Sequence, residues 1–407
     1  MHTHEVLALV HCASLEKGVA KHTHTVPFHR PSIDEQDIAA VVACLRSGWL
    51  TTGPRVAEFE AEFARYIGVP HAIAVNSCTA AMHLTLAALG IGPGDEVITT
   101  PYTFVATCEA IEYVGARPVF VDVDPVTGNI DLMRIEAAVT PRTRALMPVH
   151  LAGYPCDMAS LEEFARRHRL FLIDDAAHAL ESELPEGKIG RFGDATCFSF
   201  YATKNITTGE GGMVTCKDAD LANAIRRLSL HGLSRDAWKR YSDTGSWYYE
   251  VIDRGYKYNL PDMAAALGLS QLRKAEEMWR RRRAIVLQYQ QAFSELPQVR
   301  IPPSPAEGKH AWHLYLLRLC PDRLRIDRNQ FIERLRQRGV HCSVHFIPLH
   351  LMPYYQKTYG LRKGDFPNAE TLYQRVVSLP LFPSMTDEEV QFVIDNVKEV
   401  CEEERVG

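Results

Sequence analysis

A lysine near the middle of the chain stands where a reactive amine can be built. Lys204 follows an apolar, aromatic run at residues 198–201 and precedes a glycine-rich turn at residues 208–212. If the run is a buried strand, the amine is partly removed from water, which lowers its pKa and leaves it neutral and nucleophilic. Such an amine can trap an aldehyde as a Schiff base. A single lysine is usually a solvated surface residue, so this interpretation depends on the other motifs.

Two adjacent carboxylates, Asp174 and Asp175, end another apolar run, and His178 follows three residues later. Such a pair can bind a metal ion, cap a helix or balance a cation. No further acidic residue or histidine stands at a convincing metal-ligand spacing, so we predict no metal site. The remaining alternatives are a helix cap and a partner for a protonated pyridine nitrogen, where a carboxylate keeps the ring an electron sink.

An anion site is indicated at residues 76–80, which follow a predicted strand and open a predicted helix. Small hydroxyl side chains and free backbone N–H groups at a helix N-terminus attract a phosphate. An ordinary Ser or Thr N-cap explains the same residues when they are considered alone.

Considered together, these motifs match the requirements of pyridoxal 5'-phosphate (PLP). In chain order the sequence supplies a phosphate-type helix start, an aromatic strand end at residues 101–104, an acidic strand end, Ser199 and Lys204. These groups correspond to an anion cup, a stacking ring, a pyridinium partner and an amine that traps an aldehyde. We therefore predict PLP as the cofactor.

The elements that must position these residues alternate along the chain from about residue 70. Buried strands are predicted where short apolar, β-branched runs occur, at residues 72–76, 96–99, 118–122, 145–149, 171–174, 196–200 and 213–216. Helical patterns lie between most of them, for example at residues 80–89 and 158–168. This alternation predicts an α/β fold with a mainly parallel seven-stranded sheet, covered on both faces, whose strand ends bind the ligand.

The pattern changes after residue 259. The predicted elements are a long helix at residues 262–296, a strand at 312–317, a helix at 328–338, a strand at 340–346 and a helix at 387–401. They indicate a smaller α+β domain joined through the long helix. We expect a PLP-binding large domain at residues 25–270 and a small C-terminal domain at residues 271–407.

The composition is typical of a soluble globular protein. Of 407 residues 46% are hydrophobic and 23% are charged, and the formal net charge is -5. This balance gives no electrostatic reason to expect nucleic acid or an anionic membrane as a partner. No apolar run reaches the ~18 residues of a membrane-spanning helix. The 10 cysteines include no Cys-x-x-Cys pair, which favours a reducing, cytoplasmic environment.

The first 24 residues are treated separately from the fold. Their apolar run is short and no basic residue precedes it, so they make a poor secretory signal. We expect a disordered or leader-like tail at residues 1–24.

With these motifs, the chain resembles the DegT-type sugar-nucleotide aminotransferases, a branch of the fold-type I PLP enzymes. The resemblance runs from about Val26 to the C-terminus. It is carried by residues 47–54 (Ser-Gly-Trp-Leu-Thr-Thr-Gly-Pro), 92–98, 175–178, 198–200, 204–205, 210–212 and 255–260 (Gly-Tyr-Lys-Tyr-Asn-Leu). Within the family, residues 231–233, 236–240 and 311–314 most resemble enzymes that aminate UDP-4-keto sugars, such as the one that forms UDP-4-amino-4-deoxy-arabinose.

The resemblance implies roles for individual residues. Lys204 would form the Schiff base and move a proton between the substrate carbon and the cofactor. Contacts with the cofactor are implied for Asp175 at the pyridine nitrogen, Phe104 on the ring, Thr79, Ala80 and Ser199 at the phosphate, and His178 near the phenolic oxygen. Thr52 and His345 would lie on the substrate side, with a buried core histidine as the alternative for His345.

The resemblance also implies a homodimer with shared active sites. In this family the loop at residues 255–260 crosses the dimer interface, so Lys257 or Asn259 would reach the partner's phosphate. Many relatives carry Asn in place of Lys257 and Arg in place of Asn259. Which of the two makes the contact therefore stays open.

The implied reaction moves an amino group from L-glutamate, by way of PLP, to a nucleotide-linked keto sugar. Two alternatives share the fold. A PLP-dependent sugar dehydratase has histidine in place of the lysine, so Lys204 argues against it. A regulatory protein without turnover has no need for the lysine, the aspartate and the glycine loop together, and this chain has all three.

Overall fold

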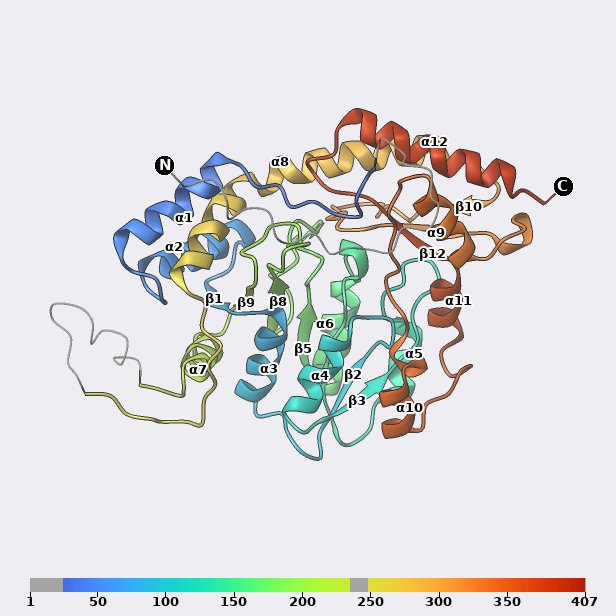
Figure 1. Ribbon diagram of the computed structural model, residues 1–407. Helices are drawn as coiled ribbons and strands as arrows, with labels where there is room; N and C mark the ends of the chain where they lie inside the picture. Colours follow the sequence, from blue (N-terminus) through green and yellow to red (C-terminus); the bar gives the residue numbers. More distant parts are fainter. Residues whose placement is uncertain (1–24, 235–247, 407) are drawn as a thin grey trace, which may run out of the picture.

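The computed structural model describes residues 25–234 and 248–406. The predicted tail at residues 1–24 and the motif at residues 236–240 lie outside the described residues. Figure 1 shows a central sheet with helices on both faces. The long helix α8 (Asp262–Phe293) and the C-terminal helix α12 (Asp387–Glu403) run side by side above that sheet.

The central sheet has seven strands in the order β1-β9-β8-β5-β4-β2-β3. The strands are β1 (His71–Val75), β2 (Glu96–Thr99), β3 (Arg117–Phe120), β4 (Thr143–Leu146), β5 (Phe171–Asp175), β8 (Ala195–Ser199) and β9 (Gly212–Cys216). Neighbours are parallel except at β9, which pairs antiparallel with both β1 and β8. The predicted α/β fold with a mainly parallel seven-stranded sheet is therefore confirmed.

Helices bury apolar stripes on both faces of this sheet. One face is covered by α3 (Cys78–Ala88), α4 (Val105–Tyr113) and α7 (Ala219–Ser229), the other by α2 (Pro54–Ile67), α6 (Met158–His168) and the first half of α8. In α2 the buried Phe59 and Phe63 lie one turn apart on the core side. Pro54 opens this helix, and Gly68 ends it with φ 84°. The helix α1 (Glu35–Ser47) packs against α8, and the short α5 (Leu132–Ile135) follows β3 in the chain.

The C-terminal part forms a second, three-stranded sheet in the order β10-β11-β12. Its elements are β10 (Val299–Arg300), β11 (Tyr315–Leu319), α9 (Arg328–Gln337), α10 (Pro353–Tyr359), α11 (Pro367–Arg375) and β12 (Val376–Leu379). Two further strands of two residues each, β6 (Glu183–Leu184) and β7 (Gly187–Lys188), pair as a separate hairpin.

Two strand predictions in this part need correction. The strand predicted at residues 312–317 begins three residues later, because Trp312 has φ 50° and breaks the extended backbone. The strand predicted at residues 340–346 is wrong. There the chain makes only single bridges, from Val340 to Val26 and from Ser343 to Ser378, while β12 takes the place beside β11.

Two hydrophobic cores are linked by α8. Leu269 and Met278 in its first half pack in the core of the large sheet, whereas Ile285 and Phe293 pack in the C-terminal core. Val26 is buried in that second core as well, so the N-terminal end of the described chain lies against the C-terminal part. Among the described residues, no helix combines the length and the apolar character that crossing a membrane requires.

Candidate active site

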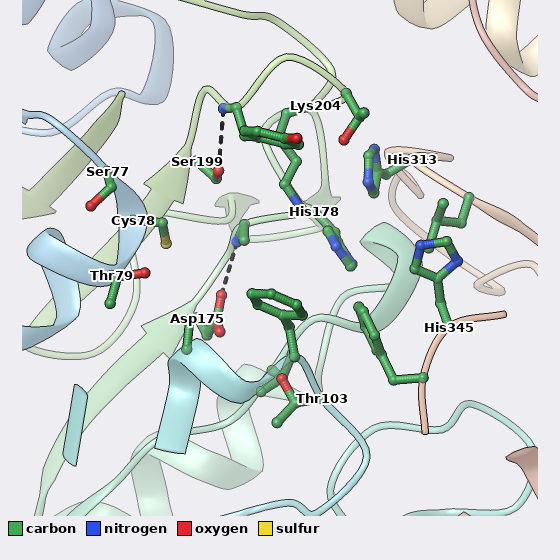
Figure 2. A pocket seen from close by; sticks show the side chains of 18 of the residues that line it. Ser77, Cys78, Thr79, Thr103, Asp175, His178, Ser199, Lys204, His313 and His345 are labelled. Atoms are coloured by element: carbon green, nitrogen blue, oxygen red, sulfur yellow. Dashed lines mark hydrogen bonds between the residues drawn. The ribbon is translucent and has the colours of Figure 1, made fainter. Parts of the chain in front are cut away.

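A cavity of about 560 Å³ lies at the carboxyl ends of the parallel strands. Asp175 ends β5, Ser199 ends β8, and the first turn of α3 follows β1 at the same edge. The C-terminal part closes the opposite side with His313 and His345. Figure 2 shows these residues around one space, with the start of α3 on one side and the histidines on the other.

Lys204 lines this cavity from the loop after β8, where its backbone N–H donates to the Tyr201 carbonyl at 2.9 Å. Burial lowers the pKa of the Lys204 amine to about 8, although the nearby Asp175 and Cys78 act in the opposite direction. An amine with this pKa is partly neutral at physiological pH and can act as a nucleophile.

The residue next to this lysine is bound to the long helix. The buried Asn205 donates from Nδ2 to the Glu181 carboxylate. Glu181 in turn forms a buried ion pair with Arg282 of α8, with Nη2 and Oε1 2.6 Å apart. The loop that carries Lys204 is thus held by the helix that joins the two cores.

The structure separates the two adjacent carboxylates. Asp175 lines the cavity and accepts hydrogen bonds from Thr107 Oγ1 at 2.7 Å and from the Ala177 N–H at 3.1 Å. Burial raises the Asp175 pKa, while these bonds and Lys204 oppose the rise. Asp174 does not line the cavity; it accepts from Thr196 Oγ1, and burial raises its pKa well above the usual range. Asp175 is therefore the carboxylate that a ligand can meet.

The first turn of α3 meets Ser199 across one end of the cavity. Ser77, Cys78 and Thr79 line the cavity there, and Figure 2 shows Ser199 on the facing strand end. The hydroxyl of Ser77 caps the helix by accepting the Ala80 N–H at 3.1 Å, so Ala80 makes a structural bond and does not line the cavity. The positive end of an 11-residue helix with hydroxyl groups around it suits a phosphate.

Aromatic rings border the same space. Phe104 lines the cavity with 60% of its surface exposed, although large apolar side chains are usually buried. Its ring centroid lies 6.2 Å from that of Phe346, which sequence reasoning did not identify. An exposed ring at a cavity wall provides a surface on which a planar ligand can stack.

Three neutral histidines form the wall opposite α3. The rings of His178 and His313 are tilted by 34° to each other with centroids 4.3 Å apart, and His345 lies beside them. Burial lowers the pKa of His178 and His313 well below the usual range and that of His345 to about 4. The Ala152 N–H donates to His178 Nδ1 at 3.3 Å, so the proton of the neutral ring is on Nε2. This wall can exchange hydrogen bonds with hydroxyl groups without adding charge.

Besides Ala80, three of the predicted residues lie outside the cavity of their own chain. Asn259 donates to Thr52 Oγ1 at 2.6 Å, and Thr52 donates to the Leu260 carbonyl at the same distance. Lys257 contacts the Asn259 amide oxygen. Thr52, Lys257 and Asn259 therefore form a cluster of their own, and their predicted contacts with cofactor or substrate stay predictions.

Sequence reasoning missed several lining residues. They are Phe28, His29, Thr103, His313 and Phe346. His313 stood in a motif that was noted only for its similarity to a group of enzymes. The segment around Phe28 has no strand or helix pattern, and it reaches the cavity because it packs against the C-terminal core. Thr103 and Thr107 stand one helical turn apart with hydroxyl oxygens separated by 2.8 Å, a spacing that the sequence does contain.

The fold and the site define a PLP-dependent enzyme of fold-type I. The model of the DegT/DnrJ/EryC1/StrS aminotransferase family matches residues 31–398, and the chain belongs to this family. It is an aminotransferase that uses PLP.

Similar proteins support the same conclusion. The spore coat polysaccharide biosynthesis protein SpsC of Bacillus subtilis is 51% identical over 94% of this chain and 98% of its own. The putative sugar aminotransferase Spr1654 of Streptococcus pneumoniae, solved with PLP and with its amine form PMP, is 36% identical in the PMP form, with a TM-score of 0.87 over 93% of this chain and 99% of its own. Helicobacter pylori PseC, an aminotransferase of pseudoaminic acid biosynthesis, is 31% identical, with a TM-score of 0.87 over 93% of this chain and 100% of its own.

The residues of the cavity fit PLP. Within the described residues Asp175 accepts hydrogen bonds only from neutral donors, so a buried carboxylate stands at the cavity wall without an ion pair. A protonated pyridine nitrogen would supply the missing charge partner. The α3 N-terminus, the exposed Phe104 and the Lys204 amine are of the kinds that the phosphate, the ring and the aldehyde of PLP would need.

The Lys204 pKa leads to a prediction for cofactor-free protein. Only the neutral amine attacks the PLP aldehyde, and a pKa of about 8 means that the neutral fraction rises with pH up to that value. The rate of covalent attachment should increase roughly tenfold per pH unit below pH 8 and level off above it. Stopped-flow measurement of the visible absorbance after mixing with PLP tests this. A rate that keeps rising to pH 10 would show an ordinary, solvated lysine.

Proposed function

We propose that this protein transfers the amino group of L-glutamate to the keto group of a nucleotide-linked sugar, with a UDP-4-keto sugar as the acceptor. The observation that carries the proposal is the buried Lys204 amine, which faces a cavity whose far wall consists of neutral hydrogen-bonding groups. SpsC and PseC, which are named for polysaccharide and pseudoaminic acid biosynthesis, support a sugar as the acceptor.

We propose that the site residues bind PLP as follows. Thr79, Ser199 and the α3 N-terminus that Ala80 helps to form hold the phosphate, and Phe104 stacks on the ring. Asp175 would hold the ring nitrogen in its protonated form, and His178, whose Nε2 carries the ring proton, would lie near the phenolic oxygen. When bound, PLP supplies a conjugated ring that takes up the electron pair released at the substrate carbon.

Lys204 would act as the proton carrier whenever its amine is free. Its Nζ has a lowered pKa, so the free amine can take a proton from the substrate carbon and return one at another position. Thr107 and the Ala177 N–H orient the Asp175 carboxylate through hydrogen bonds.

His345 and His313 are the residues we propose for the sugar. Both are neutral, and His345 Nδ1 lies 2.8 Å from Ser378 Oγ, which fixes the orientation of the ring. Neutral rings can hydrogen-bond the hydroxyl groups of a sugar, whereas a charged wall would favour an ionic substrate.

All nine cysteines among the described residues are free thiols, which supports a cytoplasmic reaction.

The two half-reactions can be tested separately. With excess L-glutamate the holoenzyme should lose its visible absorption band, and addition of a UDP-4-keto sugar should restore it and yield a UDP-linked amino sugar by mass spectrometry. Matched UDP-sugars without a keto group should not restore the band. If the glutamate-treated enzyme regains its band only with keto acids, the sugar acceptor is wrong while the aminotransferase class stands.

We also propose that the active sites are shared across a homodimer. Lys204→Ala dimers should be inactive through their own lysine, and Lys257→Ala/Asn259→Ala dimers should be weakened through the partner's phosphate contact. A mixed dimer places both lesions in one site and leaves the other intact, so about half of wild-type activity should return. The two parent homodimers are the controls. Verified mixed dimers no more active than either parent would mean that the loop does not serve the partner's site.

A further inference from the structure

A second cavity, of about 490 Å³, lies in the C-terminal part between β11, the turn that follows it and α11. Its lining includes four arginines and a single carboxylate, and it shares no lining residue with the cavity of Lys204. The arginines are Arg300, Arg318, Arg323 and Arg375, and the carboxylate is Asp322. Four cations less one anion leave three net positive charges in one concavity, in a chain whose formal net charge is -5.

Arg318 is held in place at the wall of this cavity. Its Nη1 donates to the Pro125 carbonyl at 2.9 Å and its Nη2 to the Val126 carbonyl at 2.7 Å. Burial lowers the pKa of Arg318, and Tyr102 and Asp124 oppose this effect electrostatically. Asp124 accepts hydrogen bonds from Val126 and Thr127 and forms no ion pair with Arg318. A desolvated cation that only carbonyl groups satisfy still favours an anionic partner.

The other three arginines are exposed, and none of them forms an ion pair with any residue of the described chain. Other arginines of the C-terminal part, such as Arg281, Arg334, Arg336 and Arg338, do pair with carboxylates. Like charges gathered in a concave site repel one another and focus their field on it. An anion that enters the cavity removes this repulsion.

We propose that this cavity is a binding site for a small molecule with a diphosphate group. Guanidinium groups match phosphate oxygens in paired hydrogen bonds, and several arginines can share two linked phosphates. The concave shape favours a small molecule over a polymer. No aromatic side chain lines the cavity, so the diphosphate itself is the recognised group and no base is stacked.

The test uses holoenzyme, in which PLP already occupies the cofactor phosphate site, and calorimetric titration with inorganic pyrophosphate. We expect binding at this cavity that weakens as salt rises, and the cavity variant distinguishes it from binding at the Lys204 site, whose proposed substrate also carries a diphosphate. Arg300→Gln/Arg375→Gln should weaken binding by roughly tenfold or more, because charge-assisted hydrogen bonds are lost. The matched control, Arg144→Gln/Arg166→Gln, removes two exposed arginines outside the cavity and should stay within about twofold of wild type.

Three results would overturn the proposal: no binding of pyrophosphate, equal weakening in both double variants, or binding that the Arg300→Gln/Arg375→Gln change leaves intact. A parallel titration with UDP shows whether the cavity accepts the diphosphate of a nucleotide. If it does, the Arg300→Gln/Arg375→Gln change should weaken UDP binding; if the cavity takes only a free diphosphate, the change should leave UDP binding unaffected. Because the readout is binding and not turnover, the result is independent of which sugar the enzyme aminates.

Discussion

Replacement of Lys204 by alanine should remove the visible absorption of the PLP-loaded protein and its transamination together. The amine is the only group that we expect to attach the cofactor covalently and to carry the proton, and proton transfer by a positioned side chain alone contributes about 10²–10⁴-fold. PLP itself should still bind, since the phosphate and ring contacts are untouched. Spectra after dialysis against PLP and single-turnover measurements with L-glutamate provide the readouts.

Two further variants sharpen this experiment. Lys204→Arg keeps a positive charge in the cavity but supplies no nucleophilic amine, so it should be as inactive as Lys204→Ala. Lys217→Ala removes an exposed lysine beyond β9 and should leave spectrum and turnover unchanged. A Lys204 variant that still turned over would disprove the assignment of the catalytic lysine.

Asp175→Asn should reduce turnover by roughly 10²-fold or more while the protein stays folded. Breaking one side of a buried charge pair typically costs about 3–5 kcal/mol, and here that cost falls on the protonated state of the cofactor ring. The amide can still accept the Thr107 hydrogen bond, so the local structure should survive. Steady-state kinetics and thermal unfolding of the same samples separate the two effects.

The adjacent carboxylate provides the matched control. Asp174 does not line the cavity, and its carboxylate accepts a hydrogen bond from Thr196 Oγ1 that the amide of asparagine can also accept. Asp174→Asn should therefore be nearly silent. If Asp174→Asn were the damaging change and Asp175→Asn the mild one, the order of the two carboxylates would be reversed.

The local sequence pattern was sufficient to predict the secondary structure of most of the large domain. The seven strands of the central sheet fall within a few residues of their predictions, because each is a short apolar run flanked by helical periodicity. The cofactor-side residues could be found for the same reason: Asp175 and Ser199 each end a strand, Lys204 lies in the loop that follows, and strand ends of a parallel sheet meet at one edge.

The substrate side of the cavity could not be predicted in this way. His313 follows a residue with positive φ, and Phe28 reaches the site through the bridge between Val26 and Val340. Residues 340–346 alternate as a strand does, yet they leave the sheet after Ser343 and carry His345 and Phe346 to the cavity. Such placements depend on packing between segments that are far apart in sequence.

The buried link from Asn205 through Glu181 to Arg282 has a mechanical consequence. An unbroken helix of 32 residues, about 48 Å long, cannot serve as a flexible hinge between the two cores that it joins. Any displacement of its middle also pulls on the loop of the reactive lysine. The two walls of the cavity should therefore move as one body, and substrates should gain entry through rearrangement of the side chains at the rim.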